Sequence, residues 1–154
     1  MAQTEVLEKI LHIREQEEKD AQIAHHQSVA FFERLATQLY QLLRKKEDAE
    51  ATYEQKLKNP TSIDEIKNQL TYIESLNKQI IHLQTEVNQA RQQMEQKQQE
   101  LTDAHVEVKK FETLIEKRLD AKKALFLKLE QESMDEISSR QYVDQIHHQN
   151  EVNT

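Results

Sequence analysis

The sequence contains two adjacent histidine pairs and many carboxylates, the residue types that could bind a metal ion or carry out acid–base chemistry. The pairs are His25–His26 and His147–His148. Neighbouring residues on a helix point about 100° apart, so the two rings of a pair are poorly placed to share a metal ion. A thin helical protein also lacks a cleft that could dry a carboxylate. Because no phosphate loop or nucleophile motif accompanies them, we expect a non-enzyme without metal or cofactor.

The composition is that of long helices. The 154-residue chain has no glycine, no cysteine and one proline, and 32% of its residues are charged. A sheet protein would lack its usual turn residues, and the absence of cysteine excludes disulfides and thiolate chemistry. No apolar run approaches the roughly 20 residues of a membrane span, and the first ten residues do not resemble a signal peptide. We therefore expect a cytoplasmic protein that does not insert into a membrane.

Charge is distributed unevenly along the chain, whose formal net charge is −7. Residues 116–130 carry five basic and three acidic side chains, whereas residues 131–154 carry one and five. An acidic chain is a poor partner for nucleic acid, because contacts to phosphate supply much of that affinity. A basic stretch within a helix is more often a solvated face than a polyanion site.

Apolar residues recur at a seven-residue step after the proline, which is typical of a coiled coil. A one-sided surface helix would drift from this step by about 20° per heptad. The first row consists of Ile66, Ile73, Ile80, Val87, Met94, Leu101, Val108 and Ile115. A companion row three residues later consists of Gln69, Leu76, Leu83, Ala90, Lys97, Ala104 and Phe111.

A second pair of rows precedes the proline. Its members are Ser28, Leu35, Leu42 and Ala49 in one row, and Phe32, Leu39, Lys46 and Tyr53 in the other. Nearer the start, the pattern is more polar and reads Ile10, Ile13, Glu17, Asp20, Ala24 and Phe31. The change between the two patterns predicts a phase shift within residues 24–32.

Pro60 separates the two sets of rows. Proline cannot continue a helix, and it pushes Asn59 out of the helical region. Ser62 and Glu65 form a capping-box pattern that starts a new helix. The sequence thus predicts an all-α fold, a long two-helix antiparallel coiled-coil hairpin in one domain over residues 1–154. The expected bounds are 4–58 for the first helix, 59–62 for the turn and 63–131 or beyond for the second. Leu39 should face Leu83, and Ile115 should lie opposite Leu7.

The end of the chain departs from the heptad pattern. Apolar residues cluster there as Leu119, Leu125, Phe126, Leu127 and Leu129. Such a cluster fits a partner site, packing against the N-terminal residues, or self-association equally well. Ser133 and Glu136 repeat the capping-box spacing, which allows a break near Glu132 and a short terminal helix within the tail, residues 133–154.

The stretches "LTDAHVEVKKFETLIEKR" and "ESMDEISSRQYV" resemble the FliJ family, the stalk proteins of the bacterial flagellar type III export apparatus, especially its Gram-positive members. The resemblance covers essentially the whole chain, and its most specific piece is Met134, Asp135, Glu136 and Ile137. It implies an antiparallel coiled coil that acts without catalysis. It also implies a place in the cytoplasm, peripheral to the membrane at the flagellar base.

The resemblance further implies partners. The open end, which carries both termini, would enter the pore of a hexameric export ATPase, and the rod would dock on the cytoplasmic domain of the export gate protein. Some members also escort export chaperones. The positions that match the gate-docking type are Gln38, Leu42, Tyr72 and Leu76, whereas Lys45, Ala49, Gln79 and Leu83 depart from it.

The resemblance gives one set of candidate residues for the ATPase contact and another for the gate contact. For the ATPase-facing end, the basic candidates are Arg14, Lys19, Lys117, Arg118, Lys122 and Lys123. For the gate face, the heptad count also puts Leu42, Leu76 and Leu83 in the hairpin core. A seam of Leu70, Asn77 and Gln84 would instead free that face for a partner.

Two other functions are compatible with a helical hairpin. One is a general coiled-coil scaffold or adaptor with no link to export. The other is a chaperone that grips clients between its helices, although "KNPTSID" offers few apolar residues at the tip. The stalk function differs from both because it requires a monomeric hairpin.

Overall fold

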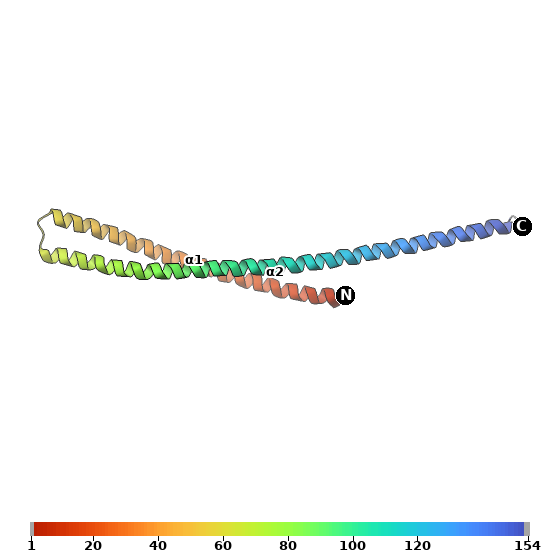
Figure 1. The fold of residues 1–154 in the computed structure, drawn as a ribbon, viewed down its shortest axis with the longest axis horizontal. Helices are drawn as coiled ribbons and strands as arrows, with labels where there is room; N and C mark the ends of the chain where they lie inside the picture. Colours follow the sequence, from red (N-terminus) through yellow and green to blue (C-terminus); the bar gives the residue numbers. More distant parts are fainter. Residues whose placement is uncertain (1, 153–154) are drawn as a thin grey trace. The chain divides into compact units, whose positions relative to one another are not determined.

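The computed structural model describes residues 2–152, which form two long helices and contain no strand (Figure 1). Helix α1 spans Ala2–Lys58 and helix α2 spans Ile63–Val152. The predicted all-α helical hairpin is confirmed. The chain divides into two compact units, which we call the turn unit (residues 14–106) and the end unit (residues 1–13 with 107–154).

The turn lies where proline predicts it, at residues 59–62. The hydroxyl of Thr61 donates to the carbonyl oxygen of Lys56 at 2.9 Å, so it satisfies one of the last carbonyls of α1. The hydroxyl oxygen of Ser62 accepts a 3.3 Å hydrogen bond from the backbone N–H of Glu65, as an N-cap does. No residue between 2 and 152 has a positive φ. The chain therefore reverses without the left-handed residue that glycine commonly supplies.

Contacts across the turn unit fix the register of its two helices. The side-chain amide of Gln69 donates to the carbonyl oxygen of Ala49 at 2.9 Å. Farther from the turn, the guanidinium of Arg91 lies 5.7 Å from the centre of the Phe32 ring. His105 Nδ1 lies 3.4 Å from the carboxylate of Glu18. To within about one helical turn, these pairs have the register that the sequence predicts, in which Leu39 faces Leu83.

The heptad rows of α2 form its buried stripe, as predicted. In the turn unit the most buried residues are Ala49, Leu76, Ile80, Leu83, Val87 and Ala90. Leu39 is half-buried on the α1 side. In the described part of the chain no side chain is completely enclosed. A seam of two helices covers each residue from one direction only, so stability depends on many partial burials.

The predicted phase shift in α1 is wrong. The half-buried row of the later part continues toward the start without interruption, through Ser28, His25, Ala21, Glu18 and Arg14. Ile13 and Phe31, which suggested the other phase, are exposed. An unbroken helix keeps one face toward its partner, so α1 retains its heptad phase even where that phase carries polar residues.

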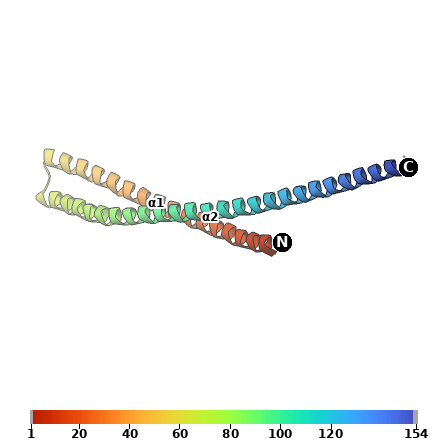
Figure 2. The same ribbon diagram turned by 45° about the vertical axis from the view of Figure 1, so that its right-hand side comes forward.

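The end unit begins with the first turns of α1 and continues as α2 alone (Figure 2). Leu7, Val108 and Ile115 are buried, in agreement with the predicted pairing of Leu7 and Ile115. From residue 116 to residue 151 every side chain is exposed. We call residues 117–151 the C-terminal segment.

The break that the sequence allowed near Glu132 does not occur, because α2 runs through this residue to Val152. No proline or glycine interrupts the segment. Glu136, the acidic member of the capping-box pattern, instead pairs with Arg140 at 3.1 Å, one turn farther along. Glu136 therefore forms an ordinary i,i+4 ion pair within a continuous helix and does not cap the start of a new one.

We expect the double substitution Ala49→Cys with Gln69→Cys to form a disulfide within one chain, because these positions face each other across the seam. The measurement is electrophoresis without reductant after mild oxidation of this otherwise cysteine-free protein. Ala49→Cys with Asn68→Cys is the control, since residue 68 points about 100° away from residue 69. Crosslinks only between chains would contradict the hairpin.

Candidate functional site

The residues that could do chemistry are scattered over the helix surfaces. His147 and His148 are exposed at the end of α2, and His25 lies half-buried in the seam beside exposed His26. Among residues 2–152 no three metal-ligating side chains gather closely enough to hold an ion. No helix in this range is both long and apolar enough to cross a bilayer. The candidate sites are therefore exposed surfaces of the two helices.

The four residues matched to the gate face lie in two different environments. Gln38 and Tyr72 are exposed, and Tyr72 retains 48% of its accessible surface. Leu76 retains 3% and Leu42 is half-buried, because both belong to the heptad rows. Leu76 is therefore buried in the seam of the hairpin, where the heptad count puts it, and Leu42 is a seam residue that is only partly accessible.

The alternative seam is wrong. Leu70 and Gln84, which it would bury, are exposed, whereas Leu83 is buried. Leu70 then becomes available for another role. In α2 we call the row of Ile66 position a and the row of Gln69 position d. Leu70 directly follows Gln69, so it occupies position e, beside the seam.

A set of exposed apolar residues on the e side of the turn unit was missed by the sequence interpretation. Tyr40 and Ile81 retain 60% and 64% of their accessible surface, and Leu43 and Leu70 retain 39% and 40%. In α1 the row of Phe32 is a and that of Ser28 is d, so Leu43 and Leu70 occupy e positions, and Tyr40 and Ile81 occupy the adjacent b positions. In an antiparallel pair the e positions of both helices border the same side of the seam. We call these four residues the apolar flank.

The charges around the apolar flank are mainly acidic. Glu47, Glu54 and Glu74 occupy neighbouring b positions and are exposed, and the basic residue nearest to them in these rows is Lys67. Glu50, at an e position, already pairs with Lys46 at 3.8 Å. An apolar surface with an acidic border complements a partner helix that has apolar anchors and basic neighbours.

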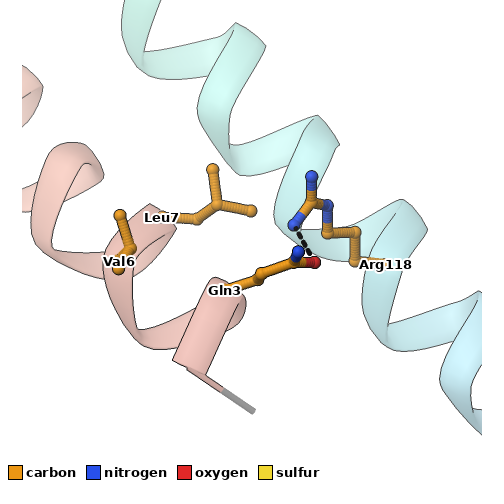
Figure 3. Close-up of a pocket in the computed structure, with 4 residues that line it drawn as sticks. All are labelled: Gln3, Val6, Leu7 and Arg118. Carbon is orange, nitrogen blue, oxygen red and sulfur yellow. Dashed lines mark hydrogen bonds between the residues drawn. The ribbon is translucent and has the colours of Figure 1, made fainter.

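The end unit places its candidate basic residues in unequal settings. Arg118 donates to the side-chain oxygen of Gln3 at 3.2 Å, beside Val6 and Leu7, and Leu7 points toward α2 (Figure 3). Arg118 thus ties the first turn of α1 to α2. Lys122 and Lys123 are exposed on α2 beyond this contact, and Lys117, directly before Arg118, is exposed as well.

The two remaining basic candidates belong to the turn unit. Arg14 lies in the half-buried row and contacts both carboxylate oxygens of Glu17 at 3.0 Å. Lys19 is exposed. The guanidinium of Arg14 is therefore engaged within its own helix, and Lys19 is the more accessible cation of the two.

The motif that carries the resemblance lies on an exposed part of α2. Met134 and Ile137 are exposed, and Asp135 accepts a 3.4 Å hydrogen bond from Gln131. Glu136 pairs with Arg140. The polar members are held by neighbours one turn away, whereas the apolar members contact solvent.

Comparison with known proteins agrees with these features. The model of the family described as "Flagellar FliJ protein" matches residues 3–146. A curated "Flagellar FliJ protein" of Bacillus subtilis (strain 168) is 36% identical over 140 residues, which cover 91% of this chain and 95% of the relative. No solved structure gives a significant match. The resemblance noted in the sequence is confirmed, and the chain belongs to the FliJ family of flagellar proteins.

Proposed function

We propose that this chain, as a FliJ-family component of the flagellar protein export apparatus, is the non-enzymatic stalk that couples the export ATPase ring to the export gate. The observation that carries the proposal is the family match over residues 3–146 of a two-helix hairpin. The turn unit and the end unit each carry exposed surface that a partner could bind. A general scaffold function would require neither this family match nor two separate docking surfaces.

The gate contact belongs on the turn unit in this proposal. The apolar flank supplies four exposed anchors, and its acidic border favours a basic partner surface. The cytoplasmic domain of the gate protein is the partner that the family resemblance suggests. Gln38 and Tyr72 border the other side of the seam, so they supply a secondary contact or none.

The ATPase contact belongs on the end unit. Lys117, Lys122 and Lys123 are exposed on α2, on either side of Arg118, which contacts Gln3. Exposed cations of this kind accelerate association with an acidic pore, and the effect weakens as salt screens it over about 8 Å at physiological ionic strength. Lys19, the other exposed basic candidate, belongs to the turn unit.

The proposed place of action follows from these partners. A stalk bound to the ATPase and the gate works in the cytoplasm, peripheral to the membrane at the flagellar base. In this proposal the working form is a monomeric hairpin, and export chaperones are further partners of the same apparatus.

The test is stimulation of the purified export ATPase. We expect Lys117→Glu, Lys122→Glu and Lys123→Glu together to reduce stimulation at low salt about tenfold, because the steering charge is reversed. Arg118 is left intact so that its bond to Gln3 persists. ATP hydrolysis at rising concentrations of the hairpin, at two salt concentrations, gives the measurement.

The matched control reverses three exposed lysines of the turn unit, Lys45, Lys58 and Lys78, which changes the net charge equally. This control should stimulate the ATPase like the unmodified protein. Equal stimulation by both triple variants at low salt would remove the end unit as the ATPase contact. Failure of the unmodified hairpin to stimulate at all would reject the coupling function.

A further inference from the structure

The e positions of α1 in the turn unit are more apolar than a two-helix seam requires. Four of the five e positions between residues 29 and 57 are apolar, and these are Val29, Ala36, Leu43 and Leu57. The g positions of the same stretch are Phe31, Gln38, Lys45 and Thr52. Apolar residues at a and d suffice for a coiled-coil pair, whereas apolar residues at a, d and e are typical of a helix in a larger bundle. Helix α1 therefore has the pattern of a helix that packs against two neighbours.

Two contacts across the seam of the turn unit show which heptad rows share a side. The guanidinium of Arg91, at an e position, lies 5.7 Å from the centre of the Phe32 ring, at an a position. His105, also at an e position, lies 3.4 Å from the carboxylate of Glu18, at an a position. On this side the a and e rows of the two helices adjoin, so the exposed apolar residues of both helices belong to one surface.

This surface extends the apolar flank toward the turn. Leu57 and Ile63 occupy e positions on either side of the turn, and both are more than half exposed. Tyr40 and Leu57 are 17 residues apart, which is about 26 Å along α1. A partner that covers the whole surface must therefore be elongated.

The b rows that border this surface have matching residues on the two helices. Tyr40 lies as many residues before the turn as Ile81 lies after it, so the two stand at the same level of the turn unit. Glu47 and Glu74 form a second such pair, seven residues nearer the turn, and both are exposed. The surface is thus bordered at one level by an apolar side chain from each helix and at the next level by a carboxylate from each helix.

We propose that one amphipathic helix of the gate protein's cytoplasmic domain lies along this surface and completes a three-helix assembly with α1 and α2. The inference rests on the proposed gate contact and names the element that makes it. A helix fits because its own residues recur at the seven-residue step of the rows that it covers. Its apolar side packs on Leu43, Leu57 and Leu70, between Tyr40 on one helix and Ile81 on the other.

The carboxylates determine the charge of the bound helix. Glu47 and Glu74 stand on opposite borders of the surface, so the bound helix carries a basic side chain on each of its flanks at this level. An amphipathic helix with acidic flanks would place like charges together and is disfavoured. The apolar residues supply the affinity, and the two carboxylates supply the selection.

The first test is photocrosslinking of the full chain to the purified cytoplasmic domain of the gate protein. A benzophenone amino acid replaces Tyr40, Ile81 or Leu57 in three separate variants, and mass spectrometry locates each attachment point. We expect the labels from positions 40 and 81 to fall within about two turns of each other on one helix, since they flank it at one level. The label from position 57 should fall about 17 residues away on the same helix, because both helices have the same rise per residue.

The outcomes separate this inference from the proposed gate contact. Labels from positions 40 and 81 in two separate elements of the bound domain would overturn the single helix and leave the gate contact standing. A domain that attaches only to a benzophenone at position 72, on the other side of the seam, would overturn both the inference and its surface. A domain that does not bind the unmodified hairpin would refute the proposed gate contact and the inference with it.

The second test reverses the two carboxylates. Glu47→Lys with Glu74→Lys should weaken binding of the domain about tenfold at low salt, since two attractive contacts become repulsive. Asp48→Lys with Asp103→Lys is the matched control, because it changes the net charge equally at exposed c positions beside the g rows. The control should bind within about twofold of the unmodified protein, and circular dichroism verifies that both variants remain helical. Equal losses in the two variants, or no loss in the first, would overturn the basic helix on this surface.

Discussion

Replacing Leu76 by alanine is expected to lower the free energy of unfolding by about 2–5 kcal/mol, the range for truncation of a buried leucine. Leu76 retains 3% of its accessible surface and lies between Ile73 and Ile80 on the seam of α2. The alanine would leave a gap that a two-helix seam can fill only by moving a helix. Circular dichroism at 222 nm during urea unfolding measures the loss.

Tyr72→Ala is the matched control, because Tyr72 lies one turn away and is about half exposed. Its effect on stability should stay within about 0.5 kcal/mol, as for other surface positions. Equal losses in the two variants would contradict the assignment of Leu76 to the seam and of Tyr72 to the surface.

Replacing both Tyr40 and Ile81 by alanine is expected to weaken binding of the gate protein's cytoplasmic domain about 100-fold. Truncation of a large anchor at an interface centre commonly costs 2 kcal/mol or more, and two anchors together reach this loss. Both side chains are mostly exposed in the free hairpin, so their removal should leave the fold intact. Titration calorimetry with the purified domain gives the affinity, and circular dichroism verifies the helicity.

Gln38→Ala with Tyr72→Ala is the comparison, since these exposed residues border the opposite side of the seam. We expect less than a fivefold loss for this pair, the effect of a rim contact. A large loss here, with none for Tyr40 and Ile81, would move the gate contact to the side first suggested by the family match.

The buried stripe of α2, the helix after Pro60, was predictable because its a positions obey one physical rule. From Ile66 to Ile115 each a position is apolar, and the buried stripe of α2 follows these positions. The turn was predictable for the same reason, since proline and the cap at Ser62 act locally. Local chemistry and the heptad pattern agree in these elements.

The first part of α1 was not predictable by following apolar residues. Ile13 and Phe31 suggested a shifted phase, yet they are exposed, and the seam there carries Arg14, Glu18 and His25. Helix continuity from the better-packed turn half determines which face meets α2. Because α1 is one continuous helix, the heptad phase of its later part also fixes which residues of its first part face α2, even though the apolar residues there would favour a different phase.

The candidate gate surface was predictable only in part. Matching single positions to a family selected Leu76, which the seam uses, and overlooked Tyr40 and Ile81. The apolar row at Val29, Ala36, Leu43 and Leu57 was a usable signal, because apolar e positions beside a and d widen the face that a helix can bury. The partner that binds this surface depends on that partner's own shape, and a heptad pattern carries no information about it.

The polar seam at the start of the turn unit bears on how cooperatively the hairpin unfolds. Between Arg14 and Ser28 the α1 side of the seam buries little apolar surface, whereas Leu76, Ile80 and Leu83 pack tightly nearer the turn. Free energy of local opening follows the apolar contacts broken, so the two stretches need not open together. We therefore expect the stretch of the seam from Arg14 to Ser28 to open at a lower free-energy cost than the stretch near the turn.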